Sequence, residues 1–262
     1  MAEENILQEI LSRLEKIESY LNTPGGPIIH HINKYRADIL SSIRRHELTN
    51  YSQIEQYIKL TSILPDATDL PPLRGWAISP DVCIKLYRHV VSVKPEVVVE
   101  FGSGASTYII ALAIKENGKG KLISFDHSDD YSNKIQRTLE SAGLVDFVDL
   151  KVAPLKVWDK SHLNKNANED VVWYDDTLVD TVGEIDFVFI DGPPGFLCQF
   201  SRYPALVVLN DALSKNAEIW LDDANRVDEK EICQDWASTF DLELEFIPHE
   251  KGLARLKRKD NK

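Results

Sequence analysis

The sequence predicts a doubly wound α/β domain, a parallel sheet covered by helices on both faces, with a helical extension at its N-terminus. Strand-like and helix-like segments alternate from Trp76 onward. The segments VVVEF (97–101) and FVFI (187–190) are largely apolar, which is typical of strands buried on both faces. Near the C-terminus, LELEFIP and LARLKR are joined only by HEKG, a pattern that predicts an antiparallel hairpin at the sheet edge.

The α/β domain is expected to take up most of the chain. The 262 residues are 43% hydrophobic, enough for one sizeable core and a short appendage. Two full domains would need a longer chain. We therefore expect an amphipathic helix at 1–22, a helical extension and linker at 23–74, and the α/β domain at 75–262.

Composition also limits the partners and the location of the protein. A net charge of -12 repels a phosphate backbone and argues against nucleic acid. Cys83, Cys198 and Cys233 form no CxxC or Cys/His cluster, as is usual for thiols in a reducing cytosol. The N-terminus lacks the basic region of a signal peptide, and no apolar run has the length of a membrane span. We expect a cytoplasmic protein.

Two helical segments are predicted before the α/β domain. The first carries a heptad seam that ends at the segment TPGGP (23–27). The seam consists of Leu7, Ile10, Leu14, Ile17 and Leu21. It fits a short coiled coil that joins subunits into a homo-oligomer, and equally an amphipathic helix that lies on its own domain. Residues 28–64 continue with helical spacing, and His30 and His31 are expected at the surface because no third ligand lies at metal-binding spacing.

Within the α/β domain, strands and helices follow in order. Ser79, Pro80 and Asp81 form a helix start, with a capping serine, a proline at the first helical position and an acid in the first turn. This helix is expected to end near Val91. Further helices are predicted after the first glycine turn to Lys115, at 131–142 and at 205–213. Strands are predicted at 96–101, 121–126, 148–153, 185–192 and 218–224.

A glycine turn at Gly102–Gly104 joins the first strand to its helix. Such a turn lets ligand atoms approach the backbone closely, although a tight turn without a ligand has the same sequence. The dinucleotide fingerprint needs a third glycine where this chain has Thr107. Asp126 ends the second strand, and a carboxylate there can accept hydrogen bonds from two ribose hydroxyls. With Glu100 at the end of the first strand, the pattern favours an adenosine with a cationic tail over a pyrophosphate.

At these residues the sequence resembles the class I S-adenosylmethionine-dependent methyltransferases. VVVEFGSGAST, LISFDH, DLKVAPL and IDFVFIDGPPG are similar to the motifs on the first four strands of that family, and the similarity runs from about Gly75 to Arg258. GWAISPD, FIDGPPG, SRYPA and LDDANR resemble a bacterial group of small O-methyltransferases found near polysaccharide and specialised-metabolite genes. The resemblance implies a Rossmann-like, seven-stranded sheet in the order 3-2-1-4-5-7-6 with strand 7 antiparallel.

The resemblance also implies roles toward S-adenosylmethionine. The glycine turn packs against the methionine and ribose, Asp126 holds the ribose, and His127 lies beside the adenine. Ala153 stands where the family usually has an acid or a hydroxyl, so an adenine contact there would come from the backbone. The expected cofactor-binding residues are Glu100, Gly102, Ser103, Gly104, Ser106, Asp126, His127, Ala153 and Asp191.

Two acids are expected to carry the chemistry at the acceptor. Asp191 and Asp223 follow the fourth and fifth strands, whose carboxyl ends open on the same edge of the sheet. Their placement resembles the metal-dependent catechol-type O-methyltransferases, in which such acids hold Mg2+. Ala224 replaces the asparagine of those enzymes. Without a metal, Asp191 or Asp223 is the general base, and Asp222 is expected to be solvated or to cap a helix.

Three further residues are candidate contacts to the acceptor, which we expect to be a small molecule or a glycan. Arg202 suits either an anionic substrate or an ion pair with the nearby acids, and Tyr203 follows it. Trp76 either covers the ligands or is a buried anchor for the N-terminal extension. His249, in the final hairpin, is expected to be a turn residue.

Two other functions can be weighed against methyl transfer. An NAD-dependent oxidoreductase would need the third turn glycine and a parallel sixth strand. A non-catalytic oligomeric scaffold with a vestigial cofactor domain should have begun to lose Glu100, the turn glycines, Asp126 and Asp191, and all of them are present. A scaffold that still binds the cofactor has to be separated from an enzyme by a turnover assay.

Overall fold

The computed structural model describes residues 2–22, 27–164, 170–179 and 183–259. The chain divides into two compact units, Met1–Ser52 and Gln53–Lys262, which we describe separately. This boundary lies before the predicted domain start at residue 75. The reason is that Leu60 and Leu64 are already buried in the core of the second unit.

The first unit is helical, as the sequence predicts. It contains α1 (Ala2–Asn22) and the first part of α2 (Pro27–Ile63). The described side chains of the predicted seam, Ile10, Leu14, Ile17 and Leu21, are between 50% and 57% exposed. The side chain of Leu7 lies outside the described residues.

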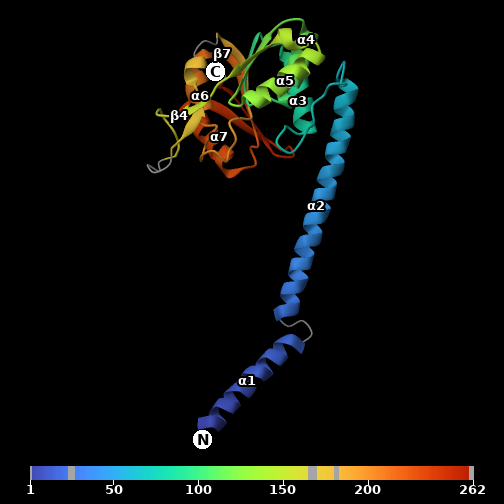
Figure 1. The fold of residues 1–262 in the computed structure, drawn as a ribbon, viewed down its shortest axis with the longest axis vertical. Coiled ribbons are helices and arrows are strands. Elements are labelled where there is room, and N and C mark those ends of the chain that lie inside the picture. Colours follow the sequence, from blue (N-terminus) through green and yellow to red (C-terminus); the bar gives the residue numbers. More distant parts are fainter. Residues whose placement is uncertain (1, 23–26, 165–169, 180–182, 260–262) are drawn as a thin grey trace. The chain divides into compact units, whose positions relative to one another are not determined.

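A seven-stranded sheet forms the centre of the second unit (Figure 1). Its strands are β1 (Val97–Phe101), β2 (Lys121–Asp126), β3 (Val148–Val152), β6 (Ile185–Ile190), β7 (Leu213–Asp222), β8 (Leu242–Ile247) and β9 (Leu253–Arg258). They lie in the order β3-β2-β1-β6-β7-β9-β8. β9 pairs antiparallel with β7 and β8, and the other pairs are parallel. The predicted Rossmann-like order and its antiparallel strand are therefore confirmed.

Helices cover both faces of this sheet. The helices are α3 (Pro80–Val93), α4 (Ala105–Asn117), α5 (Asp129–Ser141), α6 (Pro204–Leu209) and α7 (Val227–Thr239), with 3-10 turns at Val145–Phe147, Asp176–Leu178 and Asn210–Ala212. α3, α4 and α5 share a core with Val98 and Phe187, whereas α6 and α7 share one with Val99 and Val188. Successive residues of β1 and β6 thus enter opposite cores, which explains why these strands are apolar throughout.

Two local features differ from the sequence prediction. A small hairpin, β4 (Leu155–Val157) and β5 (Val172–Tyr174), lies in a stretch where no element was predicted. Strands of three residues are too short to show a period. The predicted helix at 205–213 ends as α6 at Leu209, and Leu213 already belongs to β7, where it pairs with Ile185.

Among the described residues, no helix combines the length and apolarity needed to cross a membrane.

Candidate active site

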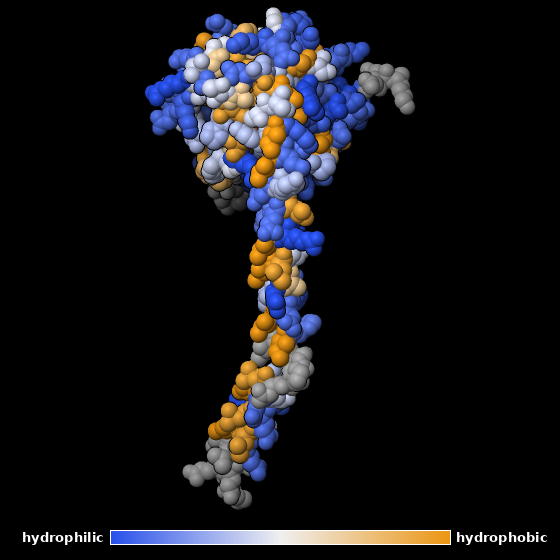
Figure 2. Space-filling view, turned by 90° about the vertical axis from the view of Figure 1, so that its right-hand side faces the viewer, coloured by the Kyte–Doolittle hydropathy of each residue, from blue (hydrophilic) through white to orange (hydrophobic). Residues whose placement is uncertain are grey.

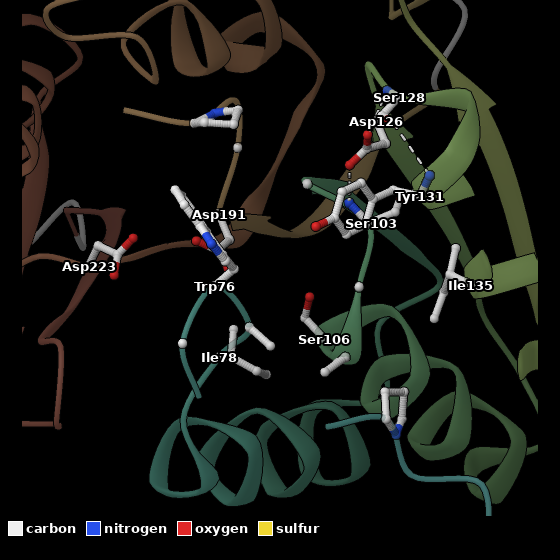
Figure 3. A pocket seen from close by; sticks show the side chains of 18 of the residues that line it. Trp76, Ile78, Ser103, Ser106, Asp126, Ser128, Tyr131, Ile135, Asp191 and Asp223 are labelled. Carbon is white, nitrogen blue, oxygen red and sulfur yellow. Dashed lines mark hydrogen bonds between the residues drawn. The ribbon is translucent and has the colours of Figure 1, made fainter. Parts of the chain in front are cut away.

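A pocket of about 770 Å³ opens at the carboxyl ends of the central parallel strands (Figure 3). It is lined by Gly102–Ser106 after β1, Asp126 at the end of β2, Asp191 after β6 and Asp223 after β7. Ligand pockets of doubly wound sheets lie at this edge and have this size. In Figure 3, Asp126 and Ser103 lie on one side of the pocket, and Asp191 and Asp223 lie on the other.

The two glycines of the turn have different reasons to be glycine. Gly102 has a φ of 94°, and a Cβ there would lie 2.9 Å from the carbonyl carbon and oxygen of Asp191. A side chain at Gly102 is therefore excluded by the protein itself. A Cβ on Gly104 would meet nothing within 4 Å, although Gly104 lines the pocket. Its missing side chain leaves space for a ligand.

Glu100 supports this turn from behind. It is fully buried, does not line the pocket of the described residues, and accepts hydrogen bonds from Thr107 Oγ1 (2.5 Å) and Ser124 Oγ (2.6 Å). Thr107 Oγ1 in turn accepts from the backbone N–H of Gly104 at 2.8 Å. Burial raises the pKa of Glu100 to about 7, against the hydroxyl hydrogen bonds that lower it. The role of Glu100 in this arrangement is to hold the turn.

Asp126 is the acid that reaches the pocket at β2. Its Oδ2 accepts from the Ser103 N–H at 3.1 Å and its Oδ1 from the Ser128 N–H at 2.8 Å, so the carboxylate is fixed in orientation. Burial raises the pKa of Asp126 above its ordinary value. His127 also lines the pocket, with Nδ1 3.6 Å from Asp126 Oδ1. Ser106 lines it as well and hydrogen-bonds to Glu100.

The residue that follows the third strand, Ala153, does not reach the described pocket as predicted. Ala153 is fully buried, donates its N–H to the carbonyl oxygen of Asp126 at 2.7 Å, and does not line the described pocket. Tyr174 of β5 does line it. Its ring stacks on Phe101 with centroids 5.5 Å apart, and its buried hydroxyl has no hydrogen-bond partner among the described residues. Burial raises the pKa of Tyr174 well above its ordinary value, so the hydroxyl is a proton donor. Sequence reasoning missed Tyr174 because its short strand has no recognisable pattern.

Arg202 joins the two acids at the other side of the pocket. Its Nη2 lies 3.0 Å from Asp191 Oδ1 and 3.0 Å from Asp223 Oδ2, and its Nη1 donates to the backbone oxygen of Asp222 at 2.9 Å. Arg202 is only 3% exposed. Of the two roles that the sequence allowed, the structure therefore has the ion pair with nearby acids. Arg226 adds a second cation, 2.9 Å from Asp223 Oδ2.

Asp222 and Asp223 are adjacent but face different surroundings. β7 ends at Asp222, and Asp223 follows in a left-handed conformation with a φ of 60° that turns the chain toward the pocket. Asp222 is fully buried, and neither of its carboxyl oxygens has a hydrogen-bond partner among the described residues. Burial raises its pKa well above the ordinary value, and the nearby Asp191 and Asp223 raise it further. The sequence had suggested that Asp222 is solvated or caps a helix, and this prediction is wrong. Asp222 is a buried acid that favours its neutral form.

The acids do not fit a magnesium ion between Asp191 and Asp223. One carboxyl oxygen each from Asp191, Asp222 and Asp223 lie within 4.8 Å of one another, as in a metal site. However, the cation between Asp191 and Asp223 is the guanidinium of Arg202, and a divalent ion on the same oxygens would lie directly against it. A neutral Asp222 adds no compensating charge. We derive no step of the reaction from a metal.

Exposed aromatic side chains lie at the pocket. Trp76 is 74% exposed and Phe196 is 73% exposed, with their ring centroids 5.9 Å apart in an edge-to-face arrangement. Both line the pocket. Trp76 is therefore not the buried anchor that the sequence allowed. Tyr203 is buried, donates its hydroxyl to Asp235 at 2.8 Å, and does not line the described pocket. His249 belongs to the turn before β9, where its Nδ1 lies 3.2 Å from Asp81 Oδ2.

Comparison with known proteins agrees with this geometry. Residues 99–224 match the model of a family described as a methyltransferase domain. No protein of a curated set matches the sequence. The second unit therefore contains a methyltransferase domain, and the resemblance to the class I methyltransferases is confirmed.

Solved structures share the fold at low sequence identity. The Podospora anserina methyltransferase PaMTH1, bound to S-adenosylhomocysteine, is 13% identical, with a TM-score of 0.54 over 84% of this chain and 96% of its own. A Geobacter sulfurreducens methyltransferase is 19% identical, with a TM-score of 0.53 over 79% and 89%. The O-methyltransferase TomG from Streptomyces achromogenes, in complex with S-adenosylmethionine, is 12% identical, with a TM-score of 0.55 over 78% and 96%.

Proposed function

We propose that this chain transfers a methyl group from S-adenosylmethionine to a hydroxyl of a small molecule or a glycan. The observation that carries the proposal is one pocket lined by Asp126 at the end of β2 and by Asp191 after β6, within a methyltransferase domain. Similarly folded methyltransferases bind S-adenosylmethionine or S-adenosylhomocysteine, and TomG is an O-methyltransferase, which supports both the cofactor and an oxygen acceptor.

We assign the cofactor to the side of the pocket formed by β1 and β2. When bound, S-adenosylmethionine supplies an electrophilic methyl group on a sulfonium. Asp126 is oriented by two backbone N–H groups and can accept both ribose hydroxyls. Gly104 leaves room beside it, and the unpartnered hydroxyl of Tyr174 offers a hydrogen bond to an acceptor atom of the ligand. Glu100 acts only through the turn that it supports.

We assign proton removal to Asp191. Burial raises its pKa to about 6, with Arg202 lowering it and Asp223 raising it. A base with this pKa is ionised at neutral pH and still holds a proton well enough to take one from a hydroxyl as the oxygen attacks. Arg202 holds Asp191 and Asp223 in place, 3.0 Å from each. Asp223 is then the group that orients the acceptor hydroxyl beside Asp191.

We assign the acceptor to the side of the pocket with Trp76 and Phe196. Large exposed aromatic rings beside a ligand pocket provide flat apolar contact surfaces. Such surfaces suit the face of an aromatic ring or of a sugar. The acceptor we propose is therefore a hydroxyl borne on a ring. The three arginines that line the pocket, Arg74, Arg202 and Arg226, are paired with acids, so none of them requires an anionic acceptor.

Self-association through the seam of α1 is a second, separate hypothesis. Its described members are exposed, as required for a coiled coil that joins subunits, and also for an amphipathic helix that has not docked. Deletion of residues 1–22, followed by light scattering, measures whether α1 carries self-association.

Calorimetry with S-adenosylmethionine, S-adenosylhomocysteine and NAD tests the cofactor. We expect binding of the first two and none of NAD, and the reverse would support an oxidoreductase. Transfer of a labelled methyl group to a panel of phenols and sugars then tests the reaction. Cofactor binding without transfer to any hydroxyl in that panel would favour the non-catalytic scaffold.

Trp76→Ala should raise the KM for the acceptor and leave cofactor affinity unchanged.

A further inference from the structure

Helix α2 presents a face of large apolar side chains that none of the described residues covers. Ile32, Ile39 and Ile43 are 60%, 57% and 50% exposed, and Tyr35 and Leu40 are similarly exposed. Figure 2 shows hydrophobic side chains along the helical segment that carries them. A continuous exposed stripe of this kind marks an interaction surface more often than a free helix.

The stripe has a regular period of 11 residues. Ile10, Leu21, Ile32, Ile43 and Ile54 follow one another at this interval. Because 11 residues make about three turns of 3.67 residues each, the three members on α2, Ile32, Ile43 and Ile54, lie in one straight row along that helix. A flanking row repeats with the same interval, at Leu40 and Tyr51. The period therefore continues beyond the predicted seam of α1, and in α2 it runs along one uninterrupted helix.

The same row structure places two opposite charges beside the stripe. Arg36 and Glu47 are also separated by 11 residues, so they occupy equivalent positions on the same side of the row of isoleucines. Within the described part of the chain, neither makes an ion pair. If two α2 helices paired in parallel and in register, positions on opposite sides of the apolar row would face each other, so Arg36 of one copy would not face Glu47 of the other. A parallel pair therefore leaves both charges without an opposite charge across the interface.

An antiparallel pair brings the two opposite charges together. In antiparallel helices, positions on the same side of the apolar row face each other. An axis midway between residues 41 and 42 places Arg36 of each copy opposite Glu47 of the other. The same axis brings Leu40 of one copy opposite Ile43 of the other, and Ile32 opposite Tyr51. One register thus matches the charges and the apolar residues together.

We propose that α2 pairs antiparallel with α2 of a second copy of this chain, about an axis between residues 41 and 42. The partner is the same chain because the surface is self-complementary, which is the property of a two-fold interface. The proposal does not depend on the chemistry of the pocket. It places the main contact on α2, where the prediction from sequence had placed it on α1.

Light scattering of the full chain tests the association. We expect a dimer at micromolar concentration, and a dimer that persists when residues 1–22 are deleted. Arg36→Glu or Glu47→Arg alone should raise the dissociation constant about tenfold, since each places like charges together in both halves of the interface. The double variant should restore the dimer. Lys34→Glu, on the opposite side of α2, is the matched control and should change nothing.

Cross-linking tests the orientation. The native cysteines are buried, so a disulfide between two chains should form only through the introduced cysteines. Chains with Arg36→Cys, mixed with chains with Glu47→Cys, should form a disulfide-linked heterodimer, whereas each variant by itself should not cross-link. Self cross-linking of either variant would mean a parallel pair and overturn the proposal. A monomeric full chain, a monomer after loss of residues 1–22, or a double variant without recovery would overturn it as well.

Discussion

Arg202 is a buried cation that compensates the negative charge of several acids at the pocket. Asp191, Asp223 and Glu229 lie within 3.8 Å of its guanidinium nitrogens. A buried arginine is always charged and presents several fixed donors, so it can hold more than one carboxylate in place. In many sites with converging carboxylates this task belongs to a metal ion. Here the polypeptide supplies the cation.

Loss of this cation should therefore be costly, whereas removal of metals should not matter. Arg202→Met is expected to lower the free energy of unfolding by about 3–5 kcal/mol, because it leaves buried charges without a partner. Arg202→Lys keeps the charge but not the geometry and should cost less. Denaturant unfolding measures both. EDTA should leave methyl transfer by the native chain unchanged, and activity lost to EDTA and restored by Mg2+ would contradict the role given to Arg202.

Asp191 sets the expected pH dependence of the reaction. Its pKa is raised to about 6, and only its ionised form can take a proton. As pH falls through about 6, kcat/KM should therefore decline, by about tenfold per unit at lower pH. Asp191→Asn should remove most of the activity at every pH while cofactor affinity changes little. A rate that rises as pH falls from 7 to 5 would exclude Asp191 as the base.

How far the sequence predicts the site depends on what fixes each residue. Asp126, Asp191 and Asp223 each follow a parallel strand, and such strand ends meet at one edge of the sheet, so their convergence was predictable. The positions of Tyr174 and Arg202 depend on the path of the chain between strands, which no periodicity reports. Burial also separates residues that are alike in sequence, as with Asp222 and its neighbour.

At the scale of elements, the final hairpin holds the loop that carries Trp76. Lys251, in the turn between β8 and β9, donates to the carbonyl oxygens of Gly75 and Ala77 at 2.8 Å each. Arg74 and Glu250 form an ion pair across the same contact. The hairpin was predicted as a sheet edge. Its second task, holding the loop at the side of the pocket that we propose for the acceptor, follows from contacts across about 175 residues that the sequence does not reveal.

The turn between β1 and α4 allows a matched pair of substitutions. Gly102→Ala should lower the free energy of unfolding by about 1–3 kcal/mol, because the residue has a positive φ and its Cβ would meet the backbone of Asp191. Gly104→Ala meets no protein atom within 4 Å, so it should leave stability unchanged and weaken cofactor binding instead. Denaturant unfolding and calorimetry separate the two effects. Equal destabilisation by both would mean that the turn is less open than described.

Elements were predictable in proportion to their length and apolar content. The central strands β1, β2 and β6 lie within about one or two residues of their predicted ends, as buried strands with long apolar runs should. The start of β7 was not predictable, because the apolar residues from Ala205 to Leu213 fit a helix as well as a helix followed by a strand. Pairing with β6 decides between them.

At the scale of the whole molecule, the cofactor should stabilise the folded methyltransferase unit. A ligand that binds only the folded state at about 100 times its Kd adds about 2.7 kcal/mol. For a unit of this size, each kcal/mol moves the Tm by about 2–4 °C, so S-adenosylhomocysteine should raise it by about 5–10 °C. NAD at the same concentration is the control and should not raise it. No shift in a folded sample would remove the basis for the cofactor assignment.

The rise in Tm with S-adenosylhomocysteine also tests which residues bind the cofactor. Asp126→Ala removes the acceptor for two ribose hydroxyls and should weaken binding by about 1–3 kcal/mol. At unchanged ligand concentration the rise in Tm should then fall to between about two thirds and about a tenth of its original size. Arg36→Glu, far from Asp126 in sequence and on the proposed dimer face, should leave the rise intact. If Asp126→Ala keeps the full shift, the ribose is held elsewhere, and the assignment of β2 to the cofactor is wrong.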